Sequence, residues 1–237
     1  MLEIKNYSKT YSKGKKVVHN LSLKIENGDI YAFVGHNGAG KTTTIKSITG
    51  ILDFEEGDIL IDGVSIKENP LLCKMNMAYI PDNPDLYEHL KGIDYLDFIA
   101  DIYKVNNETR EKLIKKYSEL FEIEKNLGDP ISSYSHGMKQ KLAIISALIH
   151  EPKLLILDEP FVGLDPVSSH SLKEIMKDLA KNGTTIFFST HVLEVAEKLC
   201  NKLAIIKDGK LVISGNMKDI LKNKSLEEIF MELETNE

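Results

Sequence analysis

A glycine-rich stretch near the start of the chain has the residue types and spacing needed to hold phosphate. The sequence GHNGAGKT, residues 35–42, fits the P-loop pattern G-x-x-x-x-G-K-[ST]. Its glycines allow the backbone to bend so that successive amide groups face one anion. Lys41 adds a positive charge for the outer phosphates of a nucleotide, and Thr42 offers a hydroxyl group to Mg²⁺. The candidate phosphate-binding residues are Gly35, His36, Asn37, Gly38, Ala39, Gly40, Lys41, Thr42 and Thr43.

Two adjacent carboxylates follow an apolar run farther along the chain. The sequence LLILDEP predicts a buried strand that ends in Asp158 and Glu159. Open α/β sheets bind ligands at the carboxyl ends of such strands. Asp158 can therefore hold Mg²⁺, and Glu159 can accept a proton from an attacking water. Adjacent carboxylates often form only a solvated turn, but a solvated turn rarely follows a wholly apolar strand.

Two further stretches are ambiguous when each is taken alone. His191 ends the apolar run TTIFFSTH, and a single histidine at a strand end is more often structural than catalytic. Ser135, His136 and Gly137 lead directly into a helical pattern. A helix N-terminus attracts anions, yet no neighbour in the sequence supplies one.

The surrounding patterns predict the elements that position these residues. The apolar run IYAFV precedes the P-loop, and Ile45, Ile48 and Leu52 recur after it at helical spacing, which argues against a chance glycine-rich turn. Alternating apolar residues predict strands in the first thirty residues, and Asp62-Gly63 predicts a hairpin. After Pro81 the pattern becomes helical, and strands return from residue 153. The predicted apolar helix faces are Tyr95, Phe98, Ile99 and Ile102; Met138, Leu142, Ile145 and Ile149; and, in the tail, Leu226, Ile229, Phe230 and Leu233.

These elements predict a strand-rich α/β body with a helical insert at about residues 82–150. The length of 237 residues suits one large domain, or one domain with an insertion. The net charge of -6 leaves no basic stripe, so we expect no nucleic-acid partner. Cys73 and Cys200 suit a reducing compartment. The N-terminus lacks the apolar core of a signal peptide, and no apolar run approaches the ~18 residues that span a bilayer, so we expect a soluble cytosolic chain.

Taken together, the motifs resemble those of the ATP-binding subunits of ABC transporters, over nearly the whole chain. The P-loop is followed by YSHGM at residues 134–138, where the family usually has the signature LSGGQ. The Walker B segment LLILDEP, the D-loop GLDP at residues 163–166 and the switch histidine of STH complete the series in the family's order. Upstream, Tyr11 stands where the family has an aromatic residue that stacks on adenine, a contact of about 1–3 kcal/mol. Packing of Tyr11 on a strand surface is the alternative.

The resemblance implies a fold, cofactors and roles. The fold would be a P-loop NTPase core with an antiparallel β subdomain, formed by residues 1–81 and 151–215, a helical subdomain at 82–150 and a short segment at 216–237. The cofactors would be ATP and Mg²⁺, with Lys41 and the loop amides on the phosphates. Thr42 and Asp158, with Asp82 near them, would hold Mg²⁺. Glu159 would be the general base, and His191 would sense the γ-phosphate.

The resemblance also implies partners, and it suggests which anion the helix that begins at Ser135 would bind. In ABC ATPases this helix points at ATP bound to the P-loop of a second subunit, so Ser135 and the Gly137 amide would complete a neighbour's site. The chain would act as a homodimer or heterodimer joined by ATP, with Asp165 on the dimer seam. An integral membrane permease would hold it on the inner face of the cell membrane.

Two departures from the family pattern narrow the resemblance. His136 replaces the first glycine of the signature, and Met138 replaces its glutamine. In YIPDNPDLY, Asp82 stands where many members have glutamine; a carboxylate can accept a hydrogen bond but cannot donate one. This combination most resembles the ATP-binding subunits of bacterial and archaeal ABC-2 type exporters.

Other classes remain as alternatives. A soluble ABC-type ATPase could serve a cytosolic assembly process such as iron–sulfur cluster biogenesis. An unrelated P-loop kinase would not need a helix aimed away from its own site. A GTPase needs N-K-x-D, and the chain has NKLA at residues 201–204. The transported substrate, the direction of transport and the identity of the permease are not determined by these residues.

Overall fold

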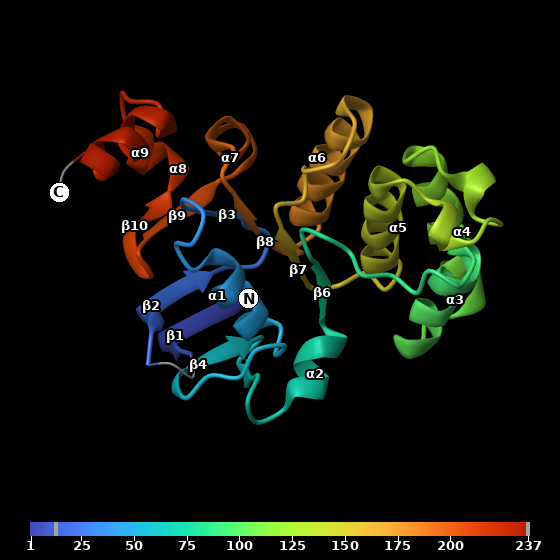
Figure 1. The fold of residues 1–237 in the computed structure, drawn as a ribbon, viewed down its shortest axis with the longest axis horizontal. Helices are drawn as coiled ribbons and strands as arrows, with labels where there is room; N and C mark the ends of the chain where they lie inside the picture. The colour runs from blue at the N-terminus through green and yellow to red at the C-terminus, as the bar shows by residue number, and fades with distance from the viewer. Residues whose placement is uncertain (12–13, 236–237) are drawn as a thin grey trace.

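The computed structural model describes residues 1–11 and 14–235 and contains two β-sheets flanked by helices (Figure 1). The larger sheet has the strand order β10-β9-β3-β8-β7-β6, in which neighbours from β9 to β6 are parallel and β10 pairs antiparallel with β9. Its strands are β3 (Ile30–Val34), β6 (Met77–Ile80), β7 (Leu154–Asp158), β8 (Thr185–Thr190), β9 (Lys202–Lys207) and β10 (Lys210–Asn216). The smaller sheet is antiparallel, with the order β2-β1-β4-β5. Its strands are β1 (Leu2–Thr10), β2 (Lys16–Ile25), β4 (Glu56–Ile61) and β5 (Val64–Ser65).

The central strands β3, β8 and β7 are fully buried and mainly apolar, as expected for a larger sheet that is covered on both faces. In β3, Ile30, Ala32 and Val34 belong to one core cluster, while Tyr31 and Phe33 belong to another. The second cluster also contains the buried apolar residues of the antiparallel sheet and of helix α1 (Lys41–Ile48). Period-2 alternation therefore divides one strand between two cores.

Helices α2 (Pro70–Met75), α3 (Gly92–Ile102), α4 (Asn107–Leu120) and α5 (His136–Leu148) precede β7, with short 3₁₀ turns at Glu124–Asn126 and Ile131–Ser133. After β7 come α6 (Pro166–Lys181), α7 (Leu193–Leu199), α8 (Met217–Leu221) and α9 (Leu226–Thr235). Helices α3, α4 and α5 form a group at one end of the molecule, and α8 and α9 lie at the other (Figure 1). No helix within residues 1–11 and 14–235 is long and apolar enough to cross a membrane.

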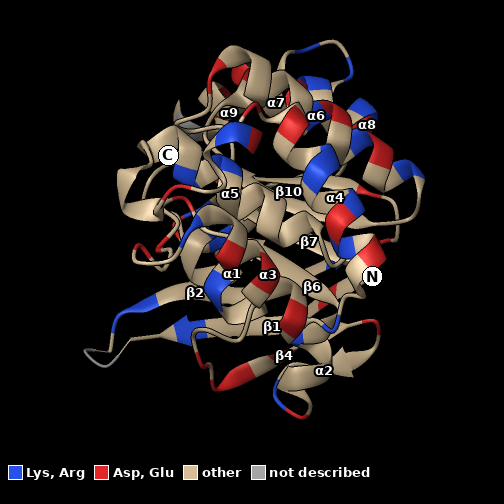
Figure 2. Cartoon of the chain, turned by 90° about the vertical axis from the view of Figure 1, so that its right-hand side faces the viewer, with Lys and Arg blue, Asp and Glu red and all other residues tan. Residues whose placement is uncertain are grey.

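The group of helices α3 to α5 shares its core with the larger sheet. Leu96, Leu113 and Ile145 lie in the same buried cluster as Val34 and Leu157. We therefore propose residues 82–150 as a helical subdomain that differs in architecture from the residues around it but has no separate core. Acidic and basic residues are interspersed over α4 and α6 on the side seen in Figure 2.

Several local predictions can be compared with the structure. Asp62 and Gly63 form the predicted hairpin turn, with Ile61 paired to Val64. The predicted apolar face of α3 is wrong in part, because Phe98 and Ile102 are 43% and 49% exposed. The helix instead buries Leu96 and Ala100, the side that packs against α4 and α5.

The helix after the P-loop and the C-terminal helix follow their predicted faces more closely. Ile45 and Ile48 are buried on α1, whereas Leu52 lies beyond the end of that helix. In α9, Leu226 and Ile229 of the predicted apolar face are buried, so the tail packs on its own chain. Both cysteines are buried free thiols.

Candidate functional site

The P-loop joins β3 to α1 and forms one wall of a pocket of about 290 Å³. Gly40 has a φ of 107°, a left-handed conformation that glycine adopts without steric cost. A Cβ atom on Gly35 would lie 2.4 Å from the Ile206 carbonyl oxygen, so only glycine fits there. The pocket is lined by Val17, Asn37, Gly38, Gly40, Lys41, Thr42, Thr43, Asp82 and Glu159. Apart from Val17, all of these residues were singled out in the sequence.

Lys41 lies at the base of this pocket. Its Nζ donates to the carbonyl oxygen of Gly35 at 2.7 Å and to that of His36 at 3.3 Å, and lies 3.8 Å from Glu159 Oε1. Burial lowers the pKa of Lys41, and the carboxylates of Glu159 and Asp158 oppose that shift. The Lys41 side chain is only 7% exposed, so solvent weakens its attraction for an added anion such as phosphate less than at the surface.

Asp158 is buried at the end of β7, beside the pocket. The Ser189 hydroxyl donates to Asp158 Oδ1 and accepts a 3.1 Å hydrogen bond from the Glu159 backbone amide. Oδ2 of Asp158 has no hydrogen-bond partner among the described residues. Burial raises the pKa of Asp158; the hydrogen bond from Ser189 and, to a smaller extent, the nearby Thr42 hydroxyl oppose the rise, while Asp82 adds to it.

The unpartnered Oδ2 atom is the observation that bears on a metal ion. A buried carboxylate oxygen without a partner fits a cation, because carboxylate and hydroxyl oxygens are the ligands that Mg²⁺ prefers. The described residues contain no group of three or more His, Cys, Asp or Glu side chains that could hold a metal alone. A magnesium ion here would therefore need oxygens of Thr42, of solvent or of a bound nucleotide as well.

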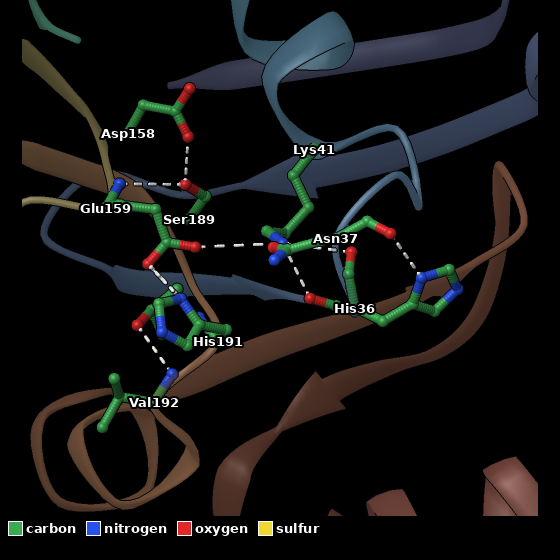
Figure 3. A network of polar contacts seen from close by, with 10 residues as sticks. His36, Asn37, Lys41, Asp158, Glu159, Ser189, His191 and Val192 are labelled. Atoms are coloured by element: carbon green, nitrogen blue, oxygen red, sulfur yellow. Dashed lines mark hydrogen bonds and ion pairs between the residues drawn. The ribbon is translucent and has the colours of Figure 1, made fainter. Parts of the chain in front are cut away.

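Glu159 lies between a lysine and a histidine (Figure 3). Its Oε1 faces Lys41, and its Oε2 is 3.0 Å from His191 Nδ1 and 3.4 Å from the His191 backbone nitrogen. Its backbone φ of 49° is uncommon for a residue with a side chain and costs of order 1 kcal/mol or more. The surrounding contacts hold Glu159 in this conformation, with its carboxylate directed at the pocket.

Tyr11 lies at the edge of the site. Its side chain is 42% exposed, and its hydroxyl is 3.4 Å from the Thr43 hydroxyl at the start of α1. An exposed ring next to the P-loop helix is available for stacking. The described contacts include no packing of Tyr11 into either hydrophobic core.

Ser135 and Gly137 do not line the P-loop pocket of their own chain. Ser135 is the N-cap of α5, where its Oγ accepts from the Met138 amide at 3.2 Å. A Cβ atom on Gly163 would meet the His136 ring at 2.7 Å, and one on Gly137 would meet the Gly163 carbonyl oxygen at 2.9 Å. The start of α5 therefore packs against the loop that follows Glu159.

A charged contact strengthens this packing. Lys141 Nζ lies 2.9 Å from Asp165 Oδ2, and Asp165 caps α6 by accepting from the Ser168 amide at 2.8 Å and its hydroxyl at 2.7 Å. These contacts hold the pKa of Asp165 well below its usual range, with the Lys141 interaction as the largest cause. Asp165 thus has partners within its own chain.

Sequence reasoning missed Ser189. Strand pairing supplies the signal that could have found it, because Asp158 and Ser189 are direct partners in the register of β7 and β8. That register follows from tertiary pairing and cannot be derived from either strand alone. The assembled site combines the glycine-rich P-loop with Lys41 and two carboxylates. Asp158 is buried and has one oxygen without a partner among the described residues, and Glu159 contacts His191.

The chain was compared with known proteins. It matches the family described as "ABC transporter" over residues 18–162. It is 35% identical to the ABC-type transporter ATP-binding protein EcsA of Bacillus subtilis, with 98% of this chain and 96% of that protein covered. It is also 35% identical to the lantibiotic transport ATP-binding protein SrtF of Streptococcus pyogenes, with 97% and 96% covered. A solved structure described as the ATP binding subunit of an ABC transporter superposes with a TM-score of 0.95 at 35% identity, covering 99% of this chain and all of the other.

Proposed function

Because the chain belongs to the ABC transporter family, as an ATP-binding subunit that hydrolyses ATP, we propose that Glu159 is the general base and that two subunits enclose the nucleotide. The observation that carries the first part is the position of the Glu159 carboxylate at the pocket, between Lys41 and His191. A carboxylate there can accept a proton from water attacking the terminal phosphate. Lys41 and the P-loop amides would stabilise the phosphate charge, since phosphoryl transfer depends mainly on positioning and electrostatics.

We assign the remaining site residues as follows. Thr42 and Asp158, with Asp82, which also lines the pocket, would hold Mg²⁺, which would supply charge neutralisation for the phosphates. His191 would orient Glu159 and respond to the γ-phosphate, because its ring already contacts that carboxylate at 3.0 Å. Tyr11 would stack on the adenine ring, which its exposure and its position beside Thr43 support.

The dimer part of the proposal follows from the position of α5. Ser135 is exposed, and neither it nor Gly137 lines its own chain's pocket. The N-terminus of α5 still presents hydrogen-bond donors suited to an anion. We therefore propose that this end contacts ATP held by the P-loop of a second subunit, either a copy of this chain or a related one.

The subunit would power a permease in the cell membrane and lie on its cytoplasmic side. Tyr87 is 53% exposed and Leu90 partly buried, on the segment between Asp82 and α3, and this segment could dock a permease. The name of SrtF, which refers to lantibiotic transport, supports an export role, as do Asp82 and YSHGM. If the chain instead serves a cytosolic assembly, a tagged copy from cells should not sediment with membranes.

The proposal is tested with Glu159→Gln, which keeps the size of the side chain but removes the proton acceptor. ATP hydrolysis should fall about 10²- to 10⁴-fold while ATP binding is retained. With hydrolysis stalled, ATP should hold the subunits as dimers in analytical ultracentrifugation. Glu174→Gln is the matched control, because Glu174 is an exposed glutamate on α6 that pairs with Lys177. Near-normal hydrolysis by the Glu159 variant would remove that residue from its role.

A further inference from the structure

Tyr79 lies on the strand that ends at the nucleotide site, and no role in the proposed function accounts for its hydroxyl group. In the pairing of β6 with β7, Tyr79 is opposite Ile156. Asp158 follows Ile156 by two positions, so its side chain points to the same face of the sheet as that of Tyr79. Tyr79 packs against the cluster that contains Ile156, which also identifies this face. The two residues are therefore diagonal neighbours on adjacent strands of one sheet, which lie about 4.8 Å apart.

Two buried polar atoms on this face lack partners. Neither the Tyr79 hydroxyl nor Asp158 Oδ2 has a hydrogen bond among the described residues. Other tyrosine hydroxyls show the usual arrangement: Tyr7 pairs with Ser47 at 2.7 Å, and Tyr31 with Ser214 at 3.1 Å. Because leaving a buried hydroxyl unpaired is unfavourable, Tyr79 calls for a partner that the described residues do not supply.

The charges around Tyr79 indicate which kind of partner fits. Burial raises the pKa of Tyr79, and the nearby carboxylates of Asp158 and Asp82 raise it further. The phenol therefore stays neutral at physiological pH and can both donate and accept a hydrogen bond. A hydrated divalent cation would satisfy both orphan atoms: Asp158 Oδ2 would ligate the metal, a water ligand of the metal would donate to the Tyr79 hydroxyl, and the two carboxylates would balance its charge.

We propose that Tyr79 is a positioning residue of the magnesium–nucleotide site, where its hydroxyl holds the hydration shell of the Mg²⁺ bound at Asp158. The inference rests on the proposed metal site and extends it to a residue outside the P-loop and Walker B segments. Tyr79 would act through the water ligands of the metal, not on the phosphate. Residues of this outer shell commonly change metal affinity by about 10–100-fold when they are altered.

The test uses Tyr79→Phe, which removes only the hydroxyl oxygen. Calorimetry measures ADP affinity with Mg²⁺ and with a chelator, and the ratio of the two affinities reports the metal's contribution. Electron paramagnetic resonance of Mn²⁺ titrated onto the ADP complex gives a second measure of metal binding. Tyr31→Phe is the matched control, because it removes a buried hydroxyl that has a protein partner, Ser214.

For Tyr79→Phe we expect unchanged ADP affinity with the chelator, a metal contribution lowered about tenfold, and weaker Mn²⁺ binding. The melting temperature of the nucleotide-free protein should be unchanged or higher, because an unsatisfied buried hydroxyl is removed. Tyr31→Phe should show the opposite pattern, with a lower melting temperature and a normal metal contribution.

One outcome would contradict the role of Tyr79, and another would contradict the proposed metal site. Normal metal affinity in Tyr79→Phe, whether or not its melting temperature falls, would overturn the role of Tyr79. If Mg²⁺ fails to strengthen ADP binding in the unaltered protein, the proposed metal site itself fails, and the inference fails with it.

Discussion

At the scale of single residues, Ser189 connects the two acidic groups of the site. Its hydroxyl donates to Asp158 Oδ1 and accepts from the Glu159 backbone amide, and the side chain is fully buried. It therefore orients a proposed metal ligand and helps to hold Glu159 at its positive φ. Since Asp158 is only 1% exposed, its Oδ1 atom cannot replace this hydrogen bond with a solvent contact.

We expect Ser189→Ala to lower the free energy of unfolding by about 1–3 kcal/mol, because it leaves buried hydrogen-bonding groups unsatisfied. The pKa of Asp158 should rise further, since the Ser189 hydrogen bond at present opposes the rise caused by burial. Urea denaturation measures the first effect. Ser132→Ala, at an exposed serine, is the control; equal stability of the two variants would contradict the role of Ser189.

At the scale of elements, helix α5 is tied down at both ends. Its first turn packs on Gly163, and beyond its last turn the His150 ring stacks on Tyr103 at 3.6 Å. His150 Nε2 lies 3.3 Å from the Met77 carbonyl oxygen in β6, so in the neutral ring this nitrogen is the donor. The end of α5 is thus joined to the end of α3 and to the sheet.

The stability of this junction should depend on pH. Burial lowers the pKa of His150 from its ordinary value of 6.5, partly opposed by hydrogen bonds to backbone carbonyls. The unfolded chain therefore binds a proton more readily than the folded one. The contribution of His150 to the free energy of unfolding is fully present above pH 6.5. It is lost as the pH falls from 6.5 to the lower pKa of the folded state, and the total loss is about 1.4 kcal/mol for each unit by which folding lowers that pKa.

His150→Phe keeps an aromatic ring against Tyr103 but cannot take up a proton. On acidification from pH 7.5 to about 5 the variant should gain stability relative to the unaltered protein, although it lacks the bond to Met77 at every pH. Chemical denaturation at several pH values in this range measures the free energy of unfolding of both proteins. Subtracting one value from the other removes the contributions of the titrating groups that the two proteins share. Parallel pH profiles for the two proteins would show that His150 titrates normally.

At the scale of the whole molecule, the two parts of the proposed nucleotide site are separate within one chain. The P-loop pocket and Glu159 form one site, while Ser135 begins a helix that does not line it. In the proposed dimer, each nucleotide would contact Lys41 of one chain and Ser135 of the other. ATP would then favour the closed dimer through its higher affinity for that state.

Mixing two inactive variants tests this arrangement. Ser135→Arg should leave ATP binding to the isolated monomer nearly intact, because that chain's P-loop is unchanged, but should abolish hydrolysis by blocking the partner's γ-phosphate. Lys41→Ala should weaken ATP binding within its own chain. A mixed dimer contains one site with an intact P-loop and an intact opposing helix, so part of the activity should return if one working site suffices.

Ser132→Arg, at an exposed serine close to Ser135, controls for the added bulk and charge and should retain hydrolysis. Binding to the monomer is the decisive measurement, because it does not depend on whether one or two sites must work. Loss of ATP affinity in monomeric Ser135→Arg would mean that the helix acts within its own chain, and the dimer arrangement would be wrong.

The sequence by itself determined the family, the P-loop, the strand that ends in Asp158 and Glu159, and the α/β class. These features are local: glycine spacing governs how the loop bends, and wholly apolar runs occur where both faces of a parallel sheet are covered. Because parallel strands place their carboxyl ends at one edge, Glu159 and His191 could be expected near the P-loop before any contact was known.

Only the tertiary structure decided which side chains meet at that edge and which helix faces are buried. The Ser189 bridge depends on the register of β7 against β8, and the position of Tyr79 depends on that of β6 against β7. Helix α3 is apolar on more than one side, so periodicity could not choose between burying Phe98 and burying Leu96. Because a one-residue slip in register moves every side chain to the other face, packing between distant segments decides which of these residues meet.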